Sequence, residues 1–226
     1  MLLEEAYELH EKLNPKIYND DNTIKPEVLD KLLEIANEFL EYIELPLNVV
    51  DIEVVGSNAS FNYNKNSDID LHIIVNNEVN YVDPNVLREL YNLKKGSFND
   101  KYDLSIYDIP VELYIEDIKD SNSTNGRYSI LQNKWIREPE PLHYDLPDIS
   151  KEVLETENLI ADTILEENEQ AIIDLINKLY MDRKLGLAYE GEMSLGNLIF
   201  KELRNNGMLQ ELKDKYYELK SNDLSI

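Results

Sequence analysis

The chain has 226 residues, 42% of them hydrophobic, which excludes a disordered polymer and fits one substantial domain or two small ones. It contains no cysteine, so disulfide frameworks, thiol nucleophiles and thiolate zinc sites are excluded. Its formal charge of −24 disfavours long polyanionic partners, and non-specific binding to duplex nucleic acid is therefore not expected.

The first residues, MLLEEAYELHEK, are too charged for a signal peptide, and no apolar run is long enough to cross a membrane. We therefore expect a cytoplasmic protein that has no membrane partner. A nucleoside triphosphate remains an acceptable ligand, because metal ions held by carboxylates offset its negative charge.

The N-terminal part predicts two helices. Residues 1–13 carry apolar side chains at helical spacing and end at Asn14-Pro15. Pro26 then begins a second helix with an apolar face, which should pack on a sheet and end near Pro46.

Residues 51–77 predict a strand, a turn, a short helix and a second strand. A helix from about Asn85 to Lys94 follows, and the polar segment GSFND is expected to be a mobile connection. Alternation on both sides of Asp108-Ile109-Pro110 predicts a hairpin or two consecutive strands over residues 101–118. YSILQNKWIREP predicts another hairpin, with Trp135 as a packing residue.

The C-terminal part is helical in pattern. We expect one long or broken helix from Ile149 to about Arg183, a turn at GLAYEGEM, and a final helix that is kinked or split at Gly207. The fold class is therefore α+β, with a small mixed β-sheet core flanked by helices and a C-terminal helical region. The predicted organisation is a core with two N-terminal helices over residues 1–138, a linker over residues 139–148 and the helical region over residues 149–226.

Two carboxylates are predicted to converge on one strand. Asp68 and Asp70 alternate with Ile69 and Leu71, so the two acids share one face and the apolar residues share the other. A solvated edge strand can show the same alternation. A shared divalent cation stabilises such like charges, and Mg²⁺ or Mn²⁺ is the candidate because carboxylates and substrate phosphates are its usual ligands.

Upstream, the apolar run that ends at Val55 is followed by Gly56-Ser57. Glycine lets backbone amides approach a phosphate closely, and a turn that opens toward a helix N-terminus favours anions. His72 lies two residues beyond Asp70 and should share the acidic face, as a histidine beside carboxylates or as a catalytic group.

These residues resemble the nucleotidyltransferase superfamily that includes DNA polymerase beta and the kanamycin nucleotidyltransferases. The motif stands here as Val55-Gly56-Ser57 and, about ten residues later, Asp68-Ile69-Asp70-Leu71. The resemblance implies a third carboxylate on a later strand. Glu112 in IPVELYIED is the best match, at a position where the superfamily more often has Asp.

A narrower resemblance involves four segments spread over most of the chain. The segments LNPKIYND, GSNASFNYNKNSDIDLH, VELYIED and RYSILQNKWI look like the predicted nucleotidyltransferases of tailed bacteriophages. This resemblance implies an activity class and a host-cytoplasmic location, and it names no substrate.

The superfamily resemblance implies transfer of a nucleoside monophosphate from an NTP to an acceptor hydroxyl, with Asp68, Asp70 and Glu112 as catalytic metal ligands and Gly56 and Ser57 as nucleotide-binding residues. The acceptor stays open between a protein side chain, a small molecule, an RNA end and a second nucleotide. Two alternatives also stay open: a catalytically silent fold that acts as a nucleotide-binding or protein-interaction factor, and a hydrolase that uses the paired carboxylates.

Overall fold

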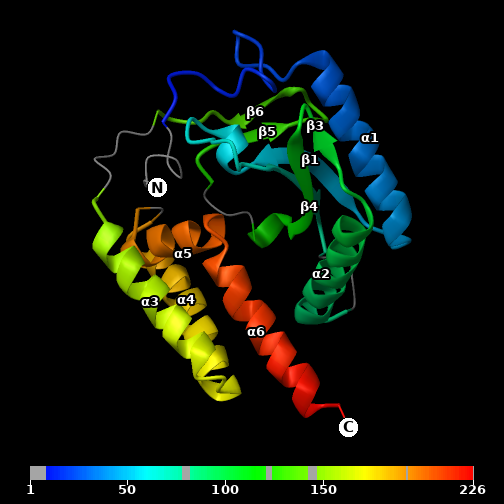
Figure 1. The fold of residues 1–226 in the computed structure, drawn as a ribbon. Coiled ribbons are helices and arrows are strands. Elements are labelled where there is room, and N and C mark those ends of the chain that lie inside the picture. Colours follow the sequence, from blue (N-terminus) through cyan, green and yellow to red (C-terminus); the bar gives the residue numbers. More distant parts are fainter. Residues whose placement is uncertain (1–8, 78–81, 121–123, 142–146, 192, 226) are drawn as a thin grey trace. The chain divides into compact units, whose positions relative to one another are not determined.

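A computed structural model describes residues 9–77, 82–120, 124–141, 147–191 and 193–225. The chain divides into two compact units, one spanning Glu8–His143 and the other containing Tyr144–Ile226 (Figure 1). Each unit has its own packing and is described by itself.

The first unit is built on a mixed sheet of six strands in the order β3-β4-β2-β1-β5-β6. Strands β2 and β4 are parallel, and the other neighbours are antiparallel. The elements in chain order are α1 (Pro26–Ile43), β1 (Val49–Val55), the 3-10 helix η2 (Ser57–Ala59), β2 (Ile69–Val75), α2 (Pro84–Lys101), β3 (Ser105–Ile106), β4 (Ile109–Asp117), the 3-10 helix η3 (Ile118–Asp120), β5 (Arg127–Ser129) and β6 (Lys134–Arg137). The predicted α+β class is confirmed.

Helix α1 forms where the sequence predicts it. Pro26 occupies its first turn, where a missing N–H costs nothing, and the helix ends at Glu44 in the left-handed conformation. Its buried stripe, which includes Leu32 and Phe39, belongs to the same apolar core as the inward residues of β2 and β4. Helices α1 and α2 lie on one side of the strands (Figure 1).

The two central strands separate an apolar from a polar face. On β2, Ile69 and Leu71 are fully buried, whereas Asp70 and His72, which alternate with them, are partly exposed. Strand β4 repeats the pattern, with Leu113 buried between partly exposed polar neighbours. Because α1 and α2 cover the apolar side, the other face of the sheet is left to carry the polar groups.

The segment over residues 101–118 forms a hairpin, and the second predicted hairpin is confirmed. Strands β3 and β4 are joined at Tyr107 and Asp108, which have φ values of 50° and 64° and so form a tight two-residue turn. Strands β5 and β6 pair around Asn133. Trp135 stacks on Tyr18 with ring centroids 5.6 Å apart, in agreement with its predicted packing role.

Two connections predicted as non-helical prove to be helix. The segment GSFND continues α2 to Lys101, because Phe98 is buried against Phe39 with ring centroids 5.0 Å apart and this burial outweighs the poor helix propensity of Gly96. The first half of GLAYEGEM likewise belongs to a helix, which runs to Tyr189.

The predicted first helix falls largely outside the described residues. Residues 9–13, the described part of it, are not helical. His10 is instead anchored to the loop that follows η2, where its backbone N–H donates to the carbonyl of Phe61 and its ring stacks on Tyr63 at 3.9 Å.

The second unit is helical. Its elements are α3 (Ser150–Leu165), α4 (Glu169–Tyr189), α5 (Leu195–Asn205) and α6 (Met208–Asp223). The expected long helix is broken before Asn168, whose side chain caps α4, and the final helix is split at Gly207, which has a φ of 87°. Ile172, Phe200 and Leu212 lie in the core between the helices.

Among the helices that the structure describes, none combines the length and the apolar composition needed to span a bilayer.

Candidate active site

Three carboxylates meet at one edge of the polar face. One oxygen from each of Asp68, Asp70 and Glu112 lies within 4.8 Å of the other two. Asp70 is on β2 and pairs in register with Glu112 on the parallel strand β4, while Asp68 precedes β2 by one residue. All three are partly exposed. Such a set of oxygens suits a hard divalent cation, which is usually held by one or two carboxylates together with waters and substrate phosphates.

Only glycine fits at position 56, because of the backbone conformation there and the lack of space for a side chain. Its φ of 75° and ψ of −158° lie in a region that essentially only glycine adopts. A Cβ atom built on it would lie 1.9 Å from the Asp70 Oδ2 atom. The bare backbone at the end of β1 therefore allows the carboxylate of Asp70 to sit directly against the turn.

Two side chains in η2 tie the turn to the start of β2. The hydroxyl of Ser57 donates to Ser67 Oγ at 2.9 Å. The fully buried side chain of Asn58 donates to the backbone carbonyl of Asp68 at 2.7 Å and accepts from Asn14 Nδ2 at 2.8 Å. The segment that leads into β2 is thus held at Ser67 by Ser57 and at Asp68 by Asn58.

Asn58 was missed from sequence because it is one of several asparagines in the polar segment NASFNYNKNS. Nothing in its spacing separates it from Asn62, Asn64 or Asn66. Its burial is a property of the folded turn.

Glu112 has a close neighbour on its own strand. The hydroxyl of Tyr114 donates to Glu112 Oε2 at 2.5 Å, and Lys95 Nζ of α2 lies 3.4 Å from the centroid of the Tyr114 ring. Burial, and then the bond to Glu112, raises the pKa of Tyr114 above its ordinary value, so the phenol stays protonated at neutral pH.

Lys95 lies in the electrostatic field of the three acids. Burial lowers the pKa of Lys95, and the negative charges of Glu112, Asp70 and Asp68 act in the opposite direction. The position of Lys95 over the Tyr114 ring depends on how α2 packs along β4.

A second polar cluster lies further along the same face. His72 Nδ1 lies 2.6 Å from Glu116 Oε2, and Glu116 also accepts from the buried guanidinium of Arg127, which donates to Glu53 as well. Burial alone would raise the pKa of Glu116, but the hydrogen bonds from His72 and Arg127 prevail and lower it to about 2. Glu116 is therefore committed to an ion pair, and His72 is placed beside carboxylates.

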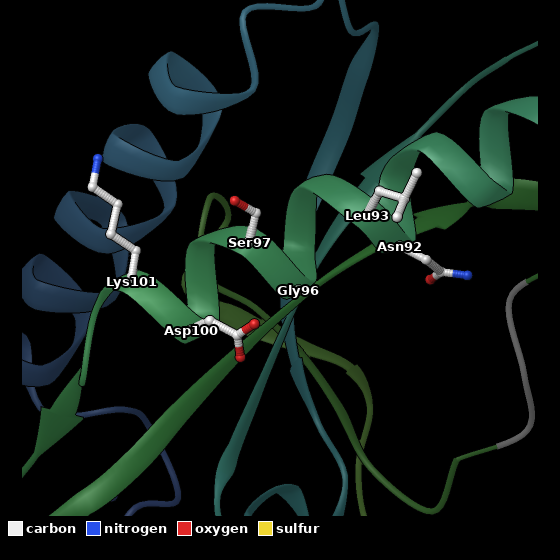
Figure 2. A pocket seen from close by; sticks show the side chains of 6 residues that line it. All are labelled: Asn92, Leu93, Gly96, Ser97, Asp100 and Lys101. Atoms are coloured by element: carbon white, nitrogen blue, oxygen red, sulfur yellow. The ribbon is translucent and has the colours of Figure 1, made fainter. Parts of the chain in front are cut away.

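A separate surface hollow of about 580 Å³ lies along α2 (Figure 2). All its lining residues come from this one helix: Asn92, Leu93, Gly96, Ser97, Asp100 and Lys101. No atom lies within 4 Å of a Cβ built on Gly96, so the hollow is open at this residue, and its lining brings together no acids from different strands. It is a shallow groove on a helix and not the candidate active site.

The comparison with known families bears directly on this constellation. Residues 29–135 match the nucleotidyltransferase domain family. The matched region contains the whole arrangement from Gly56 to Glu112, and the match supports the predicted superfamily. The narrower likeness to phage proteins stays a prediction from sequence.

Two solved structures are also similar to this chain. One is a STING-associated CdnE c-di-GMP synthase from Capnocytophaga granulosa, with 15% identity over 89% of this chain and 84% of that chain and a TM-score of 0.26. The other is a CdnE cyclic dinucleotide synthase from Elizabethkingia meningoseptica, solved with GTP and Apcpp, with 12% identity over 88% of this chain and 86% of that chain and a TM-score of 0.27. Among curated proteins, a search finds no match.

Proposed function

We propose that this chain transfers a nucleoside monophosphate from an NTP to an acceptor hydroxyl, with release of pyrophosphate, by two-metal catalysis. The observation that carries the proposal is the convergence of Asp68, Asp70 and Glu112, whose oxygens lie within 4.8 Å of one another beside the turn at Gly56. In this proposal residues 1–138 form the catalytic core, residues 139–148 the linker and residues 149–226 the helical region.

The donor set fits Mg²⁺ or Mn²⁺. Three carboxylates offer only hard oxygen ligands, and their partial exposure leaves room for the waters and phosphates that these ions retain. Ions bound there would neutralise charge on the triphosphate and lower the pKa of the acceptor hydroxyl.

Each residue then has a separate task. Asp68 and Asp70 would contribute oxygens to both metal positions, and Glu112 would complete the position on the acceptor side. Gly56 lets the chain approach the triphosphate, so that the backbone amide and the hydroxyl of Ser57 would hold the phosphates in line for transfer.

The acceptor is proposed within four classes: a protein side chain, a small molecule, an RNA end or a second nucleotide. The chain's formal charge of −24 disfavours a long polyanion, because phosphate contacts depend on cationic side chains. A short or small acceptor therefore fits best.

The test is incubation with each of the four NTPs, labelled at the α-phosphate, and Mg²⁺ or Mn²⁺. Protein, small-molecule and RNA fractions are then separated. Wild type should place label in one fraction, and Asp70→Asn should abolish it. In parallel, Mn²⁺ binding in the presence of a non-hydrolysable NTP analogue should be strong in wild type and weak in Asp68→Asn and Asp70→Asn.

Two outcomes would contradict the proposal. Equal Mn²⁺ binding by wild type and both variants would place the metal elsewhere. Normal Mn²⁺ and nucleotide binding with no labelled product from any NTP, across all acceptor fractions, would favour the catalytically silent alternative.

A further inference from the structure

The side chain of Glu112 is long for a metal ligand that must be held in one place. A glutamate has more rotamer freedom than an aspartate, and confining it costs conformational entropy. In the folded chain its carboxylate is confined by a neighbour on its own strand, because Tyr114 lies two residues further and so shares its face.

The contact between the two side chains is direct. The Tyr114 hydroxyl donates to Glu112 Oε2 at 2.5 Å. A carboxylate has two oxygens and about four lone-pair sites, so one such bond fixes its direction while leaving the other oxygen available to a cation. The direction of the Glu112 carboxylate decides whether one of its oxygens lies within 4.8 Å of those of Asp68 and Asp70.

The Tyr114 ring is itself held from two other elements. Lys95 of α2 places its ammonium 3.4 Å from the ring centroid, a cation–π contact. On β2, the His72 ring lies 4.9 Å from it at an interplanar angle of 32°. His72 is in turn fixed at 2.6 Å by Glu116. The phenol is therefore placed by packing on both sides and not by its bond to Glu112 alone.

We propose that Tyr114 is a positioning residue for the metal site, whose hydroxyl aims the carboxylate of Glu112 at Asp68 and Asp70. The proposal rests on the proposed function, since it assigns Glu112 as the third metal ligand. It adds a residue that touches neither metal nor substrate and acts only through Glu112.

The first test is Tyr114→Phe, which keeps the ring and removes only the hydroxyl. Partners that orient a metal ligand are typically worth roughly 10- to 100-fold in metal affinity or activity. We expect the affinity for Mn²⁺, measured by electron paramagnetic resonance with a non-hydrolysable NTP analogue, to fall by that factor. The kcat should fall similarly while the KM for the NTP stays unchanged.

Tyr91→Phe is the matched control. Tyr91 is a buried tyrosine whose hydroxyl also donates to a side-chain oxygen, Asn77 Oδ1, at 2.8 Å. Asn77 lies beyond the far end of β2, at the opposite end of the strand from Asp68. Removing this hydroxyl should leave Mn²⁺ affinity unchanged.

The decisive measurement is a double-mutant cycle with Glu112→Asp. The shorter carboxylate no longer reaches the phenol, so Glu112→Asp alone should weaken Mn²⁺ binding, and adding Tyr114→Phe should then have no further effect. A purely structural role would instead lower the unfolding temperature equally in both backgrounds and leave Mn²⁺ affinity unchanged in each.

The outcomes separate this inference from the proposed function. Wild-type Mn²⁺ affinity and kcat in Tyr114→Phe, or wild-type Mn²⁺ affinity in Glu112→Asp, would overturn the positioning role while leaving the metal site intact. If Asp70→Asn also binds Mn²⁺ like wild type, the proposed function itself has failed. Thermal unfolding of each variant shows whether it is folded, and the Glu112→Asp result stands even where Tyr114→Phe does not fold.

Discussion

Replacing Gly56 by alanine directly perturbs the contact between the turn and the carboxylates. The backbone there has a φ of 75° and a ψ of −158°, which costs an alanine about 1–3 kcal/mol of strain. The added Cβ would also lie 1.9 Å from Asp70 Oδ2 and 3.0 Å from its Cγ. Strain and overlap therefore act on the same residue pair.

The size of the effect follows from these distances. Ordinary contact begins at 3.4 Å, so the Asp70 carboxylate or the turn must move by about 1.5 Å. Metal ligands tolerate deviations of about 0.2 Å, and a misplacement of about 1 Å can cost roughly 100-fold in rate. We expect Gly56→Ala to lower turnover by at least about 100-fold. It should also weaken Mn²⁺ binding and lower the free energy of unfolding by about 1–3 kcal/mol.

The assays are transfer of α-labelled NTP, Mn²⁺ binding with a non-hydrolysable NTP analogue, and urea denaturation. Gly96→Ala is the control, because no atom lies within 4 Å of its would-be Cβ and Gly96 stands in the open groove of α2 (Figure 2). The free energy of unfolding of Gly96→Ala should rise by about 0.5–1 kcal/mol, and this variant should keep full activity. Wild-type turnover and Mn²⁺ affinity in Gly56→Ala would refute the idea that the turn confines Asp70.

The remaining predictions concern the supports of the site and the charge of the chain. Asn58→Ala should lower the free energy of unfolding, measured by denaturation, by about 1–3 kcal/mol for each buried group left without its partner. It should also reduce kcat, measured by labelled transfer, because Asp68 loses the bond that Asn58 makes to its carbonyl. Because the pKa of Glu116 is lowered from 4.5 to about 2, its bonds to His72 and Arg127 stabilise the fold above pH 4.5 and lose that effect as pH falls toward 2. Denaturation midpoints should therefore show Glu116→Gln less stable than wild type near neutral pH, with the difference vanishing in acid. A gel shift at low salt should show no tight binding to random duplex, and robust micromolar binding would reveal a basic patch that outweighs the net charge.

Local patterns predicted most of the secondary structure because they depend on neighbours in the chain. The alternation of Asp68 and Asp70 with apolar residues predicted that the two acids lie on the same side of the chain, and their oxygens do lie within 4.8 Å of one another. Turn residues marked both hairpins, and Pro26 marked the start of α1. Two errors, at GSFND and GLAYEGEM, arose where glycine signalled a break and the chain stayed helical. At GSFND the burial of Phe98 outweighed the local preference.

The contacts that hold the site residues in place could not be predicted as well from sequence. Gly56 was identified as a turn that admits a phosphate, whereas the structure adds a reason that no local pattern contains, the contact with Asp70. The two-residue spacing of Glu112 and Tyr114 is enough to predict that they share one face of a strand. The hydrogen bond between them and the contact of Tyr114 with Lys95 depend on side-chain direction and on the packing of α2.

By itself, the sequence determined which residues share a face and which segments turn, because the periods of strands and helices are properties of the backbone. It determined that Asp68 and Asp70 lie together and that Glu112 points to the polar side of its own strand. Only the tertiary structure decided that Asp70 lies opposite Glu112. These two residues are 42 positions apart in the sequence, and the register between β2 and β4 is set by how the two strands pack, which no local pattern along the chain specifies.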